Sequence, residues 1–314
     1  MPLDIEDCGQ NRPRDGAIVI ALVNNMPDAA LEATEGQFGS LLAAAAGALP
    51  VRLRRVWLPE VPRGAQALER IAGGYFSVED LAAEPPDALI VTGMEPRAPA
   101  LEQEPYWERI VQLLEWAQLH TVSSIWSCLA AHAAVQAFAG VRRQRLEEKC
   151  FGVFGHDILA QHPLLRGVAA PFATPHSRWN ELPMDRLQAA GFEILSASRD
   201  TGVDLFVRSG RSLLVCLQGH PEYEDVTLLK EYRRDVGRFL RGEQRAWPTL
   251  PHGYFGERGL EALARYRRDV EPARDPARFA DFPTSALAAE LRAPWRSPAV
   301  ALYRNWLDHL AGAR

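Results

Sequence analysis

Continuous apolar runs are the feature of this sequence that most constrains its fold. Ile18–Val23 reads IVIALV and Leu213–Leu217 reads LLVCL, without the alternation of polar and apolar residues that a half-buried strand shows. Such runs are typical of strands buried on both faces, which occur mainly in parallel sheets covered by helices. The other candidate strands are Ala88–Val91, Val122–Trp126, Glu193–Ser196 and Leu205–Val207.

Stretches with helical periodicity separate these candidate strands. In each of them apolar residues recur at a spacing of three and four, which is the pattern of an amphipathic helix. The candidate helices are Thr34–Ala46, Pro105–Leu119, Leu129–Ala139 and Val226–Leu240. The alternation of strands with helices predicts an α/β fold with an open, mostly parallel sheet flanked by helices.

The alternating pattern weakens after residue 240. Segments rich in Arg and Pro follow, and a clear amphipathic period returns only in a last candidate helix, Ala299–Ala311. We therefore expect residues 1–240 to form the catalytic α/β domain and residues 241–314 to form an irregular C-terminal extension that packs on the same domain.

Composition and charge narrow the class of protein. With 47% hydrophobic and 24% charged residues, the 314-residue chain is typical of a folded globular protein. Its net charge of −5 and its scattered arginines exclude the basic stripe of a nucleic-acid-binding protein. No stretch approaches the roughly 18 uninterrupted apolar residues of a membrane span, and the N-terminus lacks an apolar signal core. We expect a cytoplasmic protein with a small-molecule partner, and no nucleic acid or membrane partner.

Three candidate strands end in residues that could form a site. Gly93 follows Val91 and Thr92, Cys128 follows the strand that ends at Trp126, and His220 follows Leu217. Ligands of open parallel sheets bind beyond the carboxyl ends of the strands. We therefore expect Gly93, Cys128 and His220 to converge.

Cys128 lies where a buried strand is expected to turn into a helix, in the segment IWSCLAAHAAV. Such a turn exposes the side chain, and the amide groups at the helix N-terminus favour an anion there, which suits a nucleophilic thiolate. The backbone N–H of Leu129 and the turn at Gly93 and Met94 could then bind an oxyanion. The alternative is that Cys128 is only a small buried residue, as we expect of the other cysteines, which show no C-x-x-C spacing.

The sequence GHPE at 219–222 offers a base and an orienting acid. His220 could accept the thiol proton of Cys128, and Glu222 could fix the tautomer of the ring. The spacing H-x-E is a weak signal, and a surface histidine beside an acidic loop is the alternative. We expect no metal site, because the histidines, including His156, His162 and His176, show no paired-ligand spacing such as H-x-x-x-H.

A series of motifs runs along nearly the whole chain. They read NNMPDAALEATEGQF (24–38), LIVTG (89–93), PYWERIVQLLEWA (105–117), SCLAAHAAV (127–135), EKCFGVF (148–154), PHSRW (175–179), GHPEYE (219–224), EYRRDV (231–236), WRS (295–297) and NWL (305–307). In sequence and in order, these motifs resemble those of the homoserine O-succinyltransferases of methionine biosynthesis. The resemblance implies a fold similar to class I glutamine amidotransferases and a homodimer. It also implies a ping-pong reaction without a bound cofactor, in which an acyl group passes from a coenzyme A thioester to the hydroxyl of L-homoserine.

The resemblance assigns roles to individual residues. Cys128 would be the nucleophile that carries the acyl group, His220 the proton acceptor and Glu222 its orienting partner. Lys149, Ser177 and Arg234 would contact the amino-acid substrate; an Arg can bind its carboxylate through two hydrogen bonds.

One departure from the family concerns the acyl donor. Arg97 stands at the position associated with the choice between succinyl and acetyl donors, where other members carry a small residue or a Glu. A cation could pair with the free carboxylate of a succinyl group, so Arg97 favours succinyl-CoA over acetyl-CoA. Homoserine and serine differ by one methylene, which is worth only about 1–3 kcal/mol in a pocket, so both acceptors stay open.

Three alternatives to succinyl transfer use the same residues. The first is an acetyl-CoA-dependent homoserine or serine O-acetyltransferase. The second is a glutaminase-type thiol hydrolase, which would release ammonia from glutamine. The third is a catalytically silent ligand-binding module, in which replacing Cys128 would change nothing.

Overall fold

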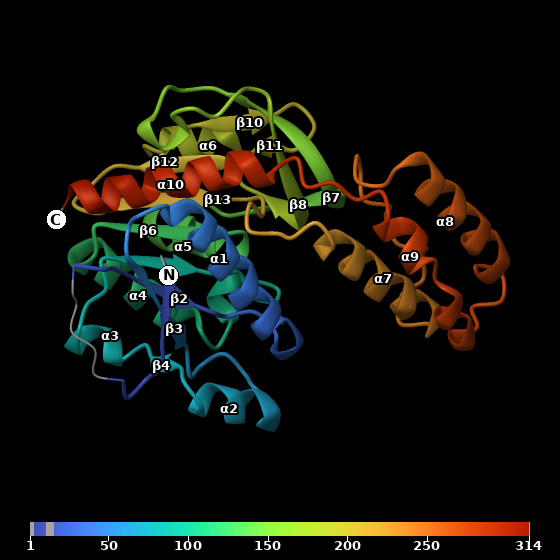
Figure 1. The fold of residues 1–314 in the computed structure, drawn as a ribbon, viewed down its shortest axis with the longest axis horizontal. Coiled ribbons are helices and arrows are strands. Elements are labelled where there is room, and N and C mark those ends of the chain that lie inside the picture. The colour runs from blue at the N-terminus through green and yellow to red at the C-terminus, as the bar shows by residue number, and fades with distance from the viewer. Residues whose placement is uncertain (1–2, 11–15, 314) are drawn as a thin grey trace.

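A large sheet forms the centre of the computed structural model, which describes residues 3–10 and 16–313 (Figure 1). Its strands lie in the order β1-β3-β2-β5-β6-β13-β12-β9, and β4 pairs with β3 at the side. Neighbours from β1 to β13 are parallel, whereas β12 is antiparallel to both β13 and β9. The bounds are β1 Leu3–Glu6, β2 Ile18–Val23, β3 Val51–Trp57, β4 Phe76–Ser77, β5 Ala88–Val91, β6 Ser123–Ser127, β9 Glu193–Ile194, β12 Leu205–Arg208 and β13 Leu213–Leu217.

Helices cover both faces of this sheet, which explains the continuous apolar runs. All six residues of β2 are buried, and alternate side chains of the central strands contribute to two separate apolar clusters. One cluster packs against α4 (Trp107–His120), α5 (Leu129–Ala139) and α6 (Met184–Ala189), and the other against α1 (Leu31–Ala46) and α10 (Arg296–Gly312). The predicted α/β fold with a mostly parallel sheet is confirmed.

A second, antiparallel sheet lies beside the first and was not expected from the sequence. Its order is β11-β10-β7-β8, with a long hairpin formed by β7 (Gln144–Ile158) and β8 (Phe172–Glu181). The predicted strand Glu193–Ser196 is divided between the sheets, because β9 pairs with β12 while β10 (Ser196–Ser198) pairs with β7. The short strand β11 is Gly202–Val203.

Strand β3 was also missed, because it reads VRLRRVW and its arginines hide the apolar pattern. Ion pairs compensate for the desolvation of these arginines. Arg54 donates from Nε to Glu6 at 2.8 Å and from Nη2 to Glu84 at 2.6 Å. A buried charge needs such partners, and these carboxylates lie far from Arg54 in the sequence.

The helices that follow β13, from α7 to α9, form a lobe that projects from one end of the molecule in Figure 1. The segment expected to be irregular contains α8 (Glu257–Val270) and α9 (Thr284–Ala288). Leu263, Tyr266 and Val270 share the inner face of α8 at a helical spacing, but the surrounding arginines mask the pattern. They join an apolar cluster with α7 (Thr227–Leu240). The predicted division into a catalytic domain, residues 1–240, and a C-terminal extension, residues 241–314, stays a prediction. Residues 1–2, 11–15 and 314 of these ranges lie outside the described residues.

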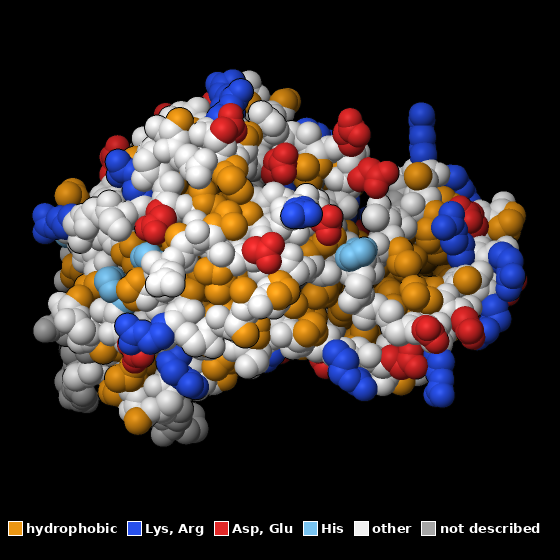
Figure 2. All heavy atoms as spheres, turned by 90° about the horizontal axis from the view of Figure 1, so that it is seen from above, with side chains coloured by type: hydrophobic (Ala, Val, Ile, Leu, Met, Phe, Trp, Pro, Cys, Tyr) orange, Lys and Arg blue, Asp and Glu red, His pale blue; other side chains and the backbone are white. Residues whose placement is uncertain are grey.

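Short elements complete the described chain. They are α2 Ala65–Ala72, α3 Asp80–Ala83, and the 3₁₀ turns η1 Asp28–Ala30, η2 Leu101–Gln103, η3 Pro163–Leu165 and η4 Pro276–Asp281. Within the described part of the chain, no helix has both the length and the hydropathy of a membrane span. On the face in Figure 2, acidic and basic side chains are interspersed and do not form one basic stripe.

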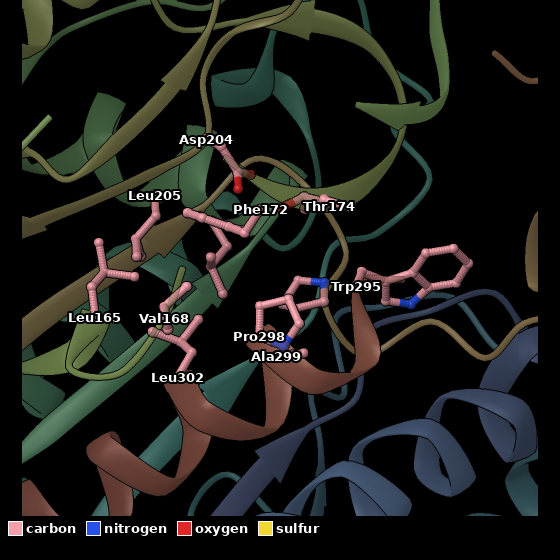
Figure 3. A pocket seen from close by; sticks show the side chains of 13 residues that line it. Leu165, Val168, Phe172, Thr174, Asp204, Leu205, Trp295, Pro298, Ala299 and Leu302 are labelled. Atoms are coloured by element: carbon pink, nitrogen blue, oxygen red, sulfur yellow. The ribbon is translucent and has the colours of Figure 1, made fainter. Parts of the chain in front are cut away.

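Helix α10 returns across the sheet and packs beside α1 (Figure 1). Trp306 on this helix is 1% exposed, and its indole Nε1 donates to Ser123 Oγ on β6 at 2.9 Å. At the start of α10, Ala299 and Leu302 face Leu205 and Phe172 around a mostly apolar cavity of about 20 Å³ (Figure 3). That volume holds a single water molecule at most, so the contact is a packed core and not a ligand site.

We expect Trp306→Ala to lower the free energy of unfolding by about 3–5 kcal/mol, since it leaves a cavity and removes the donor to Ser123 Oγ. Urea unfolding followed by circular dichroism measures the change, with Leu119→Ala as the control because Leu119 is 53% exposed. A loss no larger for Trp306→Ala than for the control would contradict the packing of α10 on the sheet.

Candidate active site

Cys128 occupies a strained turn between β6 and α5. Its backbone has φ 52° and ψ −114°, a conformation that favours glycine. The Cys128 N–H donates to the Leu217 carbonyl of β13 at 2.7 Å, and its carbonyl accepts the first hydrogen bond of the helix from the His132 N–H at 3.2 Å. Such conformations persist only where the surroundings enforce them, and they concentrate at functional sites.

The other three cysteines are poor candidates for a nucleophile. All four cysteines are free, and Cys8 is exposed at the edge of the molecule. Burial raises the pKa of the Cys150 thiol to about 11, and burial also raises the pKa of Cys216. Both thiols are therefore protonated at neutral pH, and a thiol in that state is inert.

His220 lies between Cys128 and Glu222. Its Nδ1 is 2.8 Å from Glu222 Oε1, and Cys128 is near enough to influence the pKa of its ring. Because a carboxylate accepts, Nδ1 donates to Glu222 and Nε2 remains for the thiol. Burial alone would lower the pKa of His220, but the Glu222 carboxylate and the Cys128 thiol raise it well above its ordinary value. The ring also stacks on Tyr223, with 4.4 Å between the centroids.

The backbone before His220 is held by the second sheet. The His220 N–H donates to the Pro175 carbonyl of β8 at 2.8 Å, and the Gly219 N–H donates to Asp204 Oδ1 at 2.8 Å. A Cβ atom on Gly219 would lie 2.4 Å from Thr174 Cγ2 and 2.8 Å from that Asp204 oxygen. Only glycine fits there, so the G-H-P-E sequence places its histidine by close packing.

The predicted oxyanion donors meet beside Cys128. A Cβ atom on Gly93 would lie 3.3 Å from the Leu129 backbone nitrogen, so the turn after β5 faces the first amide of α5. Met94 and Leu129 line the same cavity as Cys128. Gly93, Met94 and Leu129 therefore lie together near Cys128, and their role in binding an oxyanion stays a prediction.

A cavity of about 650 Å³ opens in front of the Cys128 side chain. This volume lies in the range of ligand pockets. The lining contains Met94, Pro96, Ala98, Pro99, Ala100, Leu101, Glu102, Cys128, Leu129, His132, Gln136, Arg142, Arg143, Arg145, Ser177, Arg178, Trp179 and Asn180. The sequence did not single out its four arginines.

Two carboxylates on α7 bring the three predicted substrate contacts together. Lys149 Nζ lies 3.3 Å from Asp235 Oδ2 and 3.8 Å from Glu231 Oε2. Ser177 Oγ donates to Glu231 Oε2 at 2.5 Å, and Arg234 Nη2 lies 2.8 Å from Asp235 Oδ1. The sequence analysis missed Glu231 and Asp235, although their spacing of four on a helix is a signal that both point the same way.

Arg97 does not line the cavity. Its side chain is exposed, and its backbone N–H, like that of Ala98, donates to Glu104 Oε1 at 2.6 Å. These bonds fasten the loop that forms one wall of the cavity. The predicted role of Arg97 in choosing the acyl donor stays a prediction.

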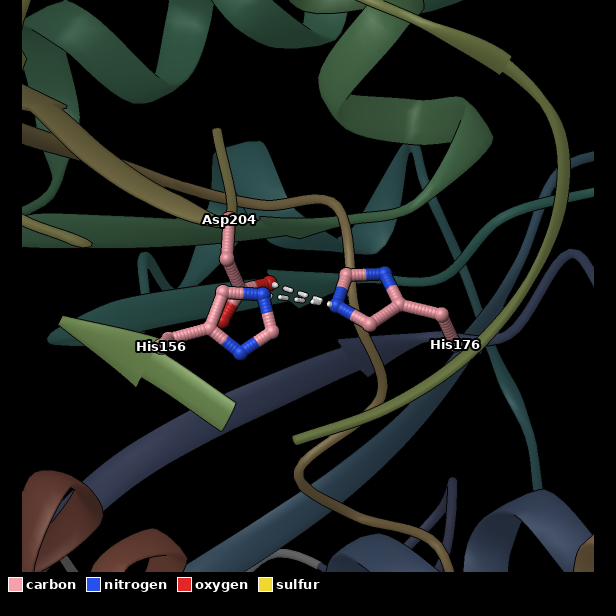
Figure 4. A group of neighbouring side chains, drawn as sticks. All are labelled: His156, His176 and Asp204. Atoms are coloured by element: carbon pink, nitrogen blue, oxygen red, sulfur yellow. Dashed lines mark hydrogen bonds and ion pairs between the residues drawn. The ribbon is translucent and has the colours of Figure 1, made fainter. Parts of the chain in front are cut away.

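His156, His176 and Asp204 form a buried cluster behind the active site (Figure 4). The Arg178 guanidinium can only donate, so His176 Nδ1 accepts from Arg178 Nε at 3.3 Å and His176 Nε2 carries the proton. That Nε2 donates to His156 Nε2 at 3.2 Å, and His156 Nδ1 donates to the Phe154 carbonyl at 3.1 Å. Burial, followed by the nearby charge of Arg178, lowers the pKa of His176 well below its ordinary value. The ring nitrogens thus have protein partners, and the expected absence of a metal stays a prediction.

The fold and the residues around Cys128 define a class of protein, the α/β proteins built like class I glutamine amidotransferases. A solved glutamine amido transferase from Methylobacillus flagellatus superposes with a TM-score of 0.52 at 15% identity, covering 94% of this chain and 95% of that one. This likeness concerns the fold alone.

The family follows from closer relatives. A family model described as homoserine O-succinyltransferase matches residues 10–313. The homoserine O-succinyltransferase of Rhodopseudomonas palustris is 48% identical over 294 residues, covering 94% of this chain and 88% of its own. That of Methylorubrum extorquens is 43% identical over 288 residues, covering 92% and 86%. The chain belongs to the homoserine O-succinyltransferase family and is an acyltransferase, as the sequence motifs predicted.

We expect the free energy of unfolding of Cys128→Gly to exceed that of Cys128→Ala by about 1–3 kcal/mol, because only glycine adopts a φ of 52° without strain. Urea unfolding of the two variants measures this difference. Both variants lack the thiol, so the comparison isolates the strain. An alanine variant as stable as the glycine variant would show that the turn is not strained.

His132 gives stability a pH dependence. It is buried on α5, its Nε2 donates to Gln218 Oε1 at 2.9 Å, and burial lowers its pKa to about 3. A histidine of the unfolded chain has a pKa near about 6.5, so the unfolded state binds one more proton below that pH. The free energy of unfolding therefore falls on acidification by about 1.4 kcal/mol per pH unit for this group.

We expect His132→Gln, which can keep the bond to Gln218, to weaken the pH dependence of stability. Between about pH 6 and pH 4, the slope of the free energy of unfolding against pH should fall by about 1.4 kcal/mol per pH unit. Urea unfolding at a series of pH values measures it, with the exposed His120→Gln as the matched control. Equal slopes in both variants would contradict a neutral, buried His132.

Proposed function

We propose that the chain transfers a succinyl group from succinyl-CoA to the hydroxyl of L-homoserine through a thioester on Cys128. The observation that carries this proposal is Cys128 itself, which stands on a strained backbone turn, faces a cavity of about 650 Å³ and is near enough to His220 to raise the pKa of that ring. Membership of the homoserine O-succinyltransferase family supports the choice of donor and acceptor.

In the first half-reaction His220 accepts the thiol proton of Cys128. The carboxylate of Glu222 supports the imidazolium that forms, which the raised pKa of His220 favours. The thiolate attacks the carbonyl carbon of succinyl-CoA, and the N–H of Leu129 and the turn at Gly93 stabilise the oxyanion. The carbon–sulfur bond to coenzyme A breaks, and the leaving thiolate takes the proton back from His220.

In the second half-reaction L-homoserine replaces coenzyme A in the cavity. His220 accepts the proton of its hydroxyl, and the oxygen attacks the thioester carbon of Cys128. The bond to sulfur breaks, the ester leaves, and the proton returns from His220 to the thiol. Exchange between two sulfur atoms is nearly balanced in energy, so the thioester stays reactive toward an alcohol.

The charges around α7 suit an amino acid. Glu231 and Asp235 are carboxylates that can bind the ammonium group of homoserine, and Ser177 already donates to Glu231. Arg234 is half exposed and can bind the substrate carboxylate through two parallel hydrogen bonds. Lys149, which is largely buried beside the two acids, balances part of their charge.

The remaining parts of the proposal concern the cell and the assembly. We propose a cytoplasmic homodimer without a bound cofactor, which the family resemblance supports. Acetyl-CoA as donor, serine as acceptor and hydrolysis of glutamine are the competing activities, and all three would use Cys128.

Initial-rate kinetics test the proposal. With succinyl-CoA and L-homoserine varied, we expect parallel double-reciprocal lines, no activity in Cys128→Ala, and a loss of about 10²–10⁴-fold in kcat for Glu222→Gln, which no longer supports the imidazolium. The rate is measured from the release of the free coenzyme A thiol. Glu224→Gln is the control, because Glu224 is exposed.

Intersecting lines together with residual activity of Cys128→Ala would exclude the covalent route. Faster turnover with acetyl-CoA would show that acetyl-CoA is the donor, and faster turnover with serine would show that serine is the acceptor. Release of ammonia from glutamine would show that the protein is a thiol hydrolase.

A further inference from the structure

One cation at the cavity has no partner. Arg143 lies between α5 and β7, lines the cavity that holds Cys128, and is half buried. Among the residues that the structure describes, none accepts a hydrogen bond from its guanidinium or pairs with it within 4.0 Å. A half-buried guanidinium in that state has lost part of its hydration without compensation, so the site favours an anion.

The surroundings of Arg143 offset its charge only in part. Burial lowers the pKa of Arg143, and the nearby Tyr106, Cys128 and Glu104 offset this only in part. Arg143 and Cys128 line the same cavity, so the guanidinium faces the space in which an acyl group on the sulfur would lie. Glu104 offsets part of its charge from a distance, but it forms no ion pair with Arg143 within 4.0 Å, and its Oε1 accepts from the backbone N–H groups of Arg97 and Ala98.

The other arginines of the cavity are occupied. Arg142 is exposed and pairs with Glu102 at 2.8 Å, and Arg145 lies over the Trp179 ring at 4.7 Å. Arg178 is buried and donates to His176, to the Asn180 carbonyl and to the Thr201 carbonyl. Among the lining arginines of the described chain, Arg143 is the half-buried one, and it has neither an acceptor nor an aromatic ring as a partner.

We propose that Arg143 binds the free carboxylate of the succinyl group, both in succinyl-CoA and in the thioester on Cys128, and so selects the donor. The inference rests on the proposed function. The carboxylate carbon lies three carbon–carbon bonds from the thioester carbon, about 4 Å when extended, so its anion must stay close to Cys128. An acetyl group has no charge to offer at this place.

This assignment differs from the one that the sequence suggested. Arg97 has an exposed side chain outside the cavity lining, whereas Arg143 shares the cavity with the nucleophile. A guanidinium donates in a fork that matches a carboxylate, so the contact would fix the orientation of the acyl chain as well as its charge.

Succinyl-CoA and acetyl-CoA differ only in the acyl group, so a comparison of the two donors isolates the contact of Arg143 with the succinyl carboxylate. For Arg143→Gln we expect kcat/KM to fall at least about 30-fold with succinyl-CoA and to change less than about 3-fold with acetyl-CoA, at saturating L-homoserine. Arg258→Gln is the matched control, because it removes one charge from a side chain that is 90% exposed and should leave the donor ratio unchanged. Arg97→Gln tests the rival assignment, and we expect it to leave the donor ratio unchanged as well. Arg143→Lys keeps the charge without the fork, and we expect it to restore part of the succinyl-CoA activity.

Equal losses with both donors would mean that Arg143 contacts coenzyme A or only supports the fold, and would overturn the proposal. A changed donor ratio in Arg97→Gln with none in Arg143→Gln would return the role to Arg97. The wild-type protein supplies a readout that needs no variant to fold: butyryl-CoA, which replaces the carboxylate by a methyl group, should acylate it at least about 30-fold more slowly than succinyl-CoA.

Butyryl transfer as fast as succinyl transfer would show that no carboxylate is recognised. These outcomes are distinct from a failure of the proposed function, in which the wild-type protein would form no thioester with succinyl-CoA.

Discussion

The backbone turn at Cys128 is the constraint on which the rest of the site depends. A non-glycine residue at φ 52° and ψ −114° is held there because its N–H bonds to β13 while its carbonyl starts α5. The parallel pairing of β6 with both β5 and β13 brings Gly93 and His220 to the same edge of the sheet. Strain at one residue is thus offset by the burial of a whole sheet, and the thiol gains a fixed direction.

The buried polar residues behind His220 serve the same purpose. Asp204 holds the Gly219 amide, the Pro175 carbonyl holds the His220 amide, and the His156–His176 pair orders Arg178 in the cavity wall. Each group has a partner, which a low-dielectric interior requires. The second sheet therefore contributes position more than chemistry: it fixes where the imidazole ring and the wall of the cavity stand.

The sequence predicted the parts of the molecule that depend on local pattern. The bounds of β2, β5, β13 and α5 agree with the expected ranges, because apolar runs and turn residues are local signals. Strand β3 and helix α8 were missed because arginines interrupt their apolar pattern, and their partners lie far away in the chain. The same limit applies to the site: the contact of Ser177 with Glu231 spans 54 positions and the isolation of Arg143 is a property of the folded cavity. Motif order identified the family nonetheless, because it draws on the whole chain.

The central claim is that the sulfur of Cys128 carries the acyl group between two substrates. Intact-protein mass spectrometry after mixing with succinyl-CoA in the absence of an acceptor tests it most directly, with peptide mapping to locate the modification. The account predicts a mass increase of one succinyl group on Cys128, lost when L-homoserine is added and absent from Cys128→Ala. An unmodified protein that still forms product, or a succinyl group on another residue that homoserine discharges, would contradict it.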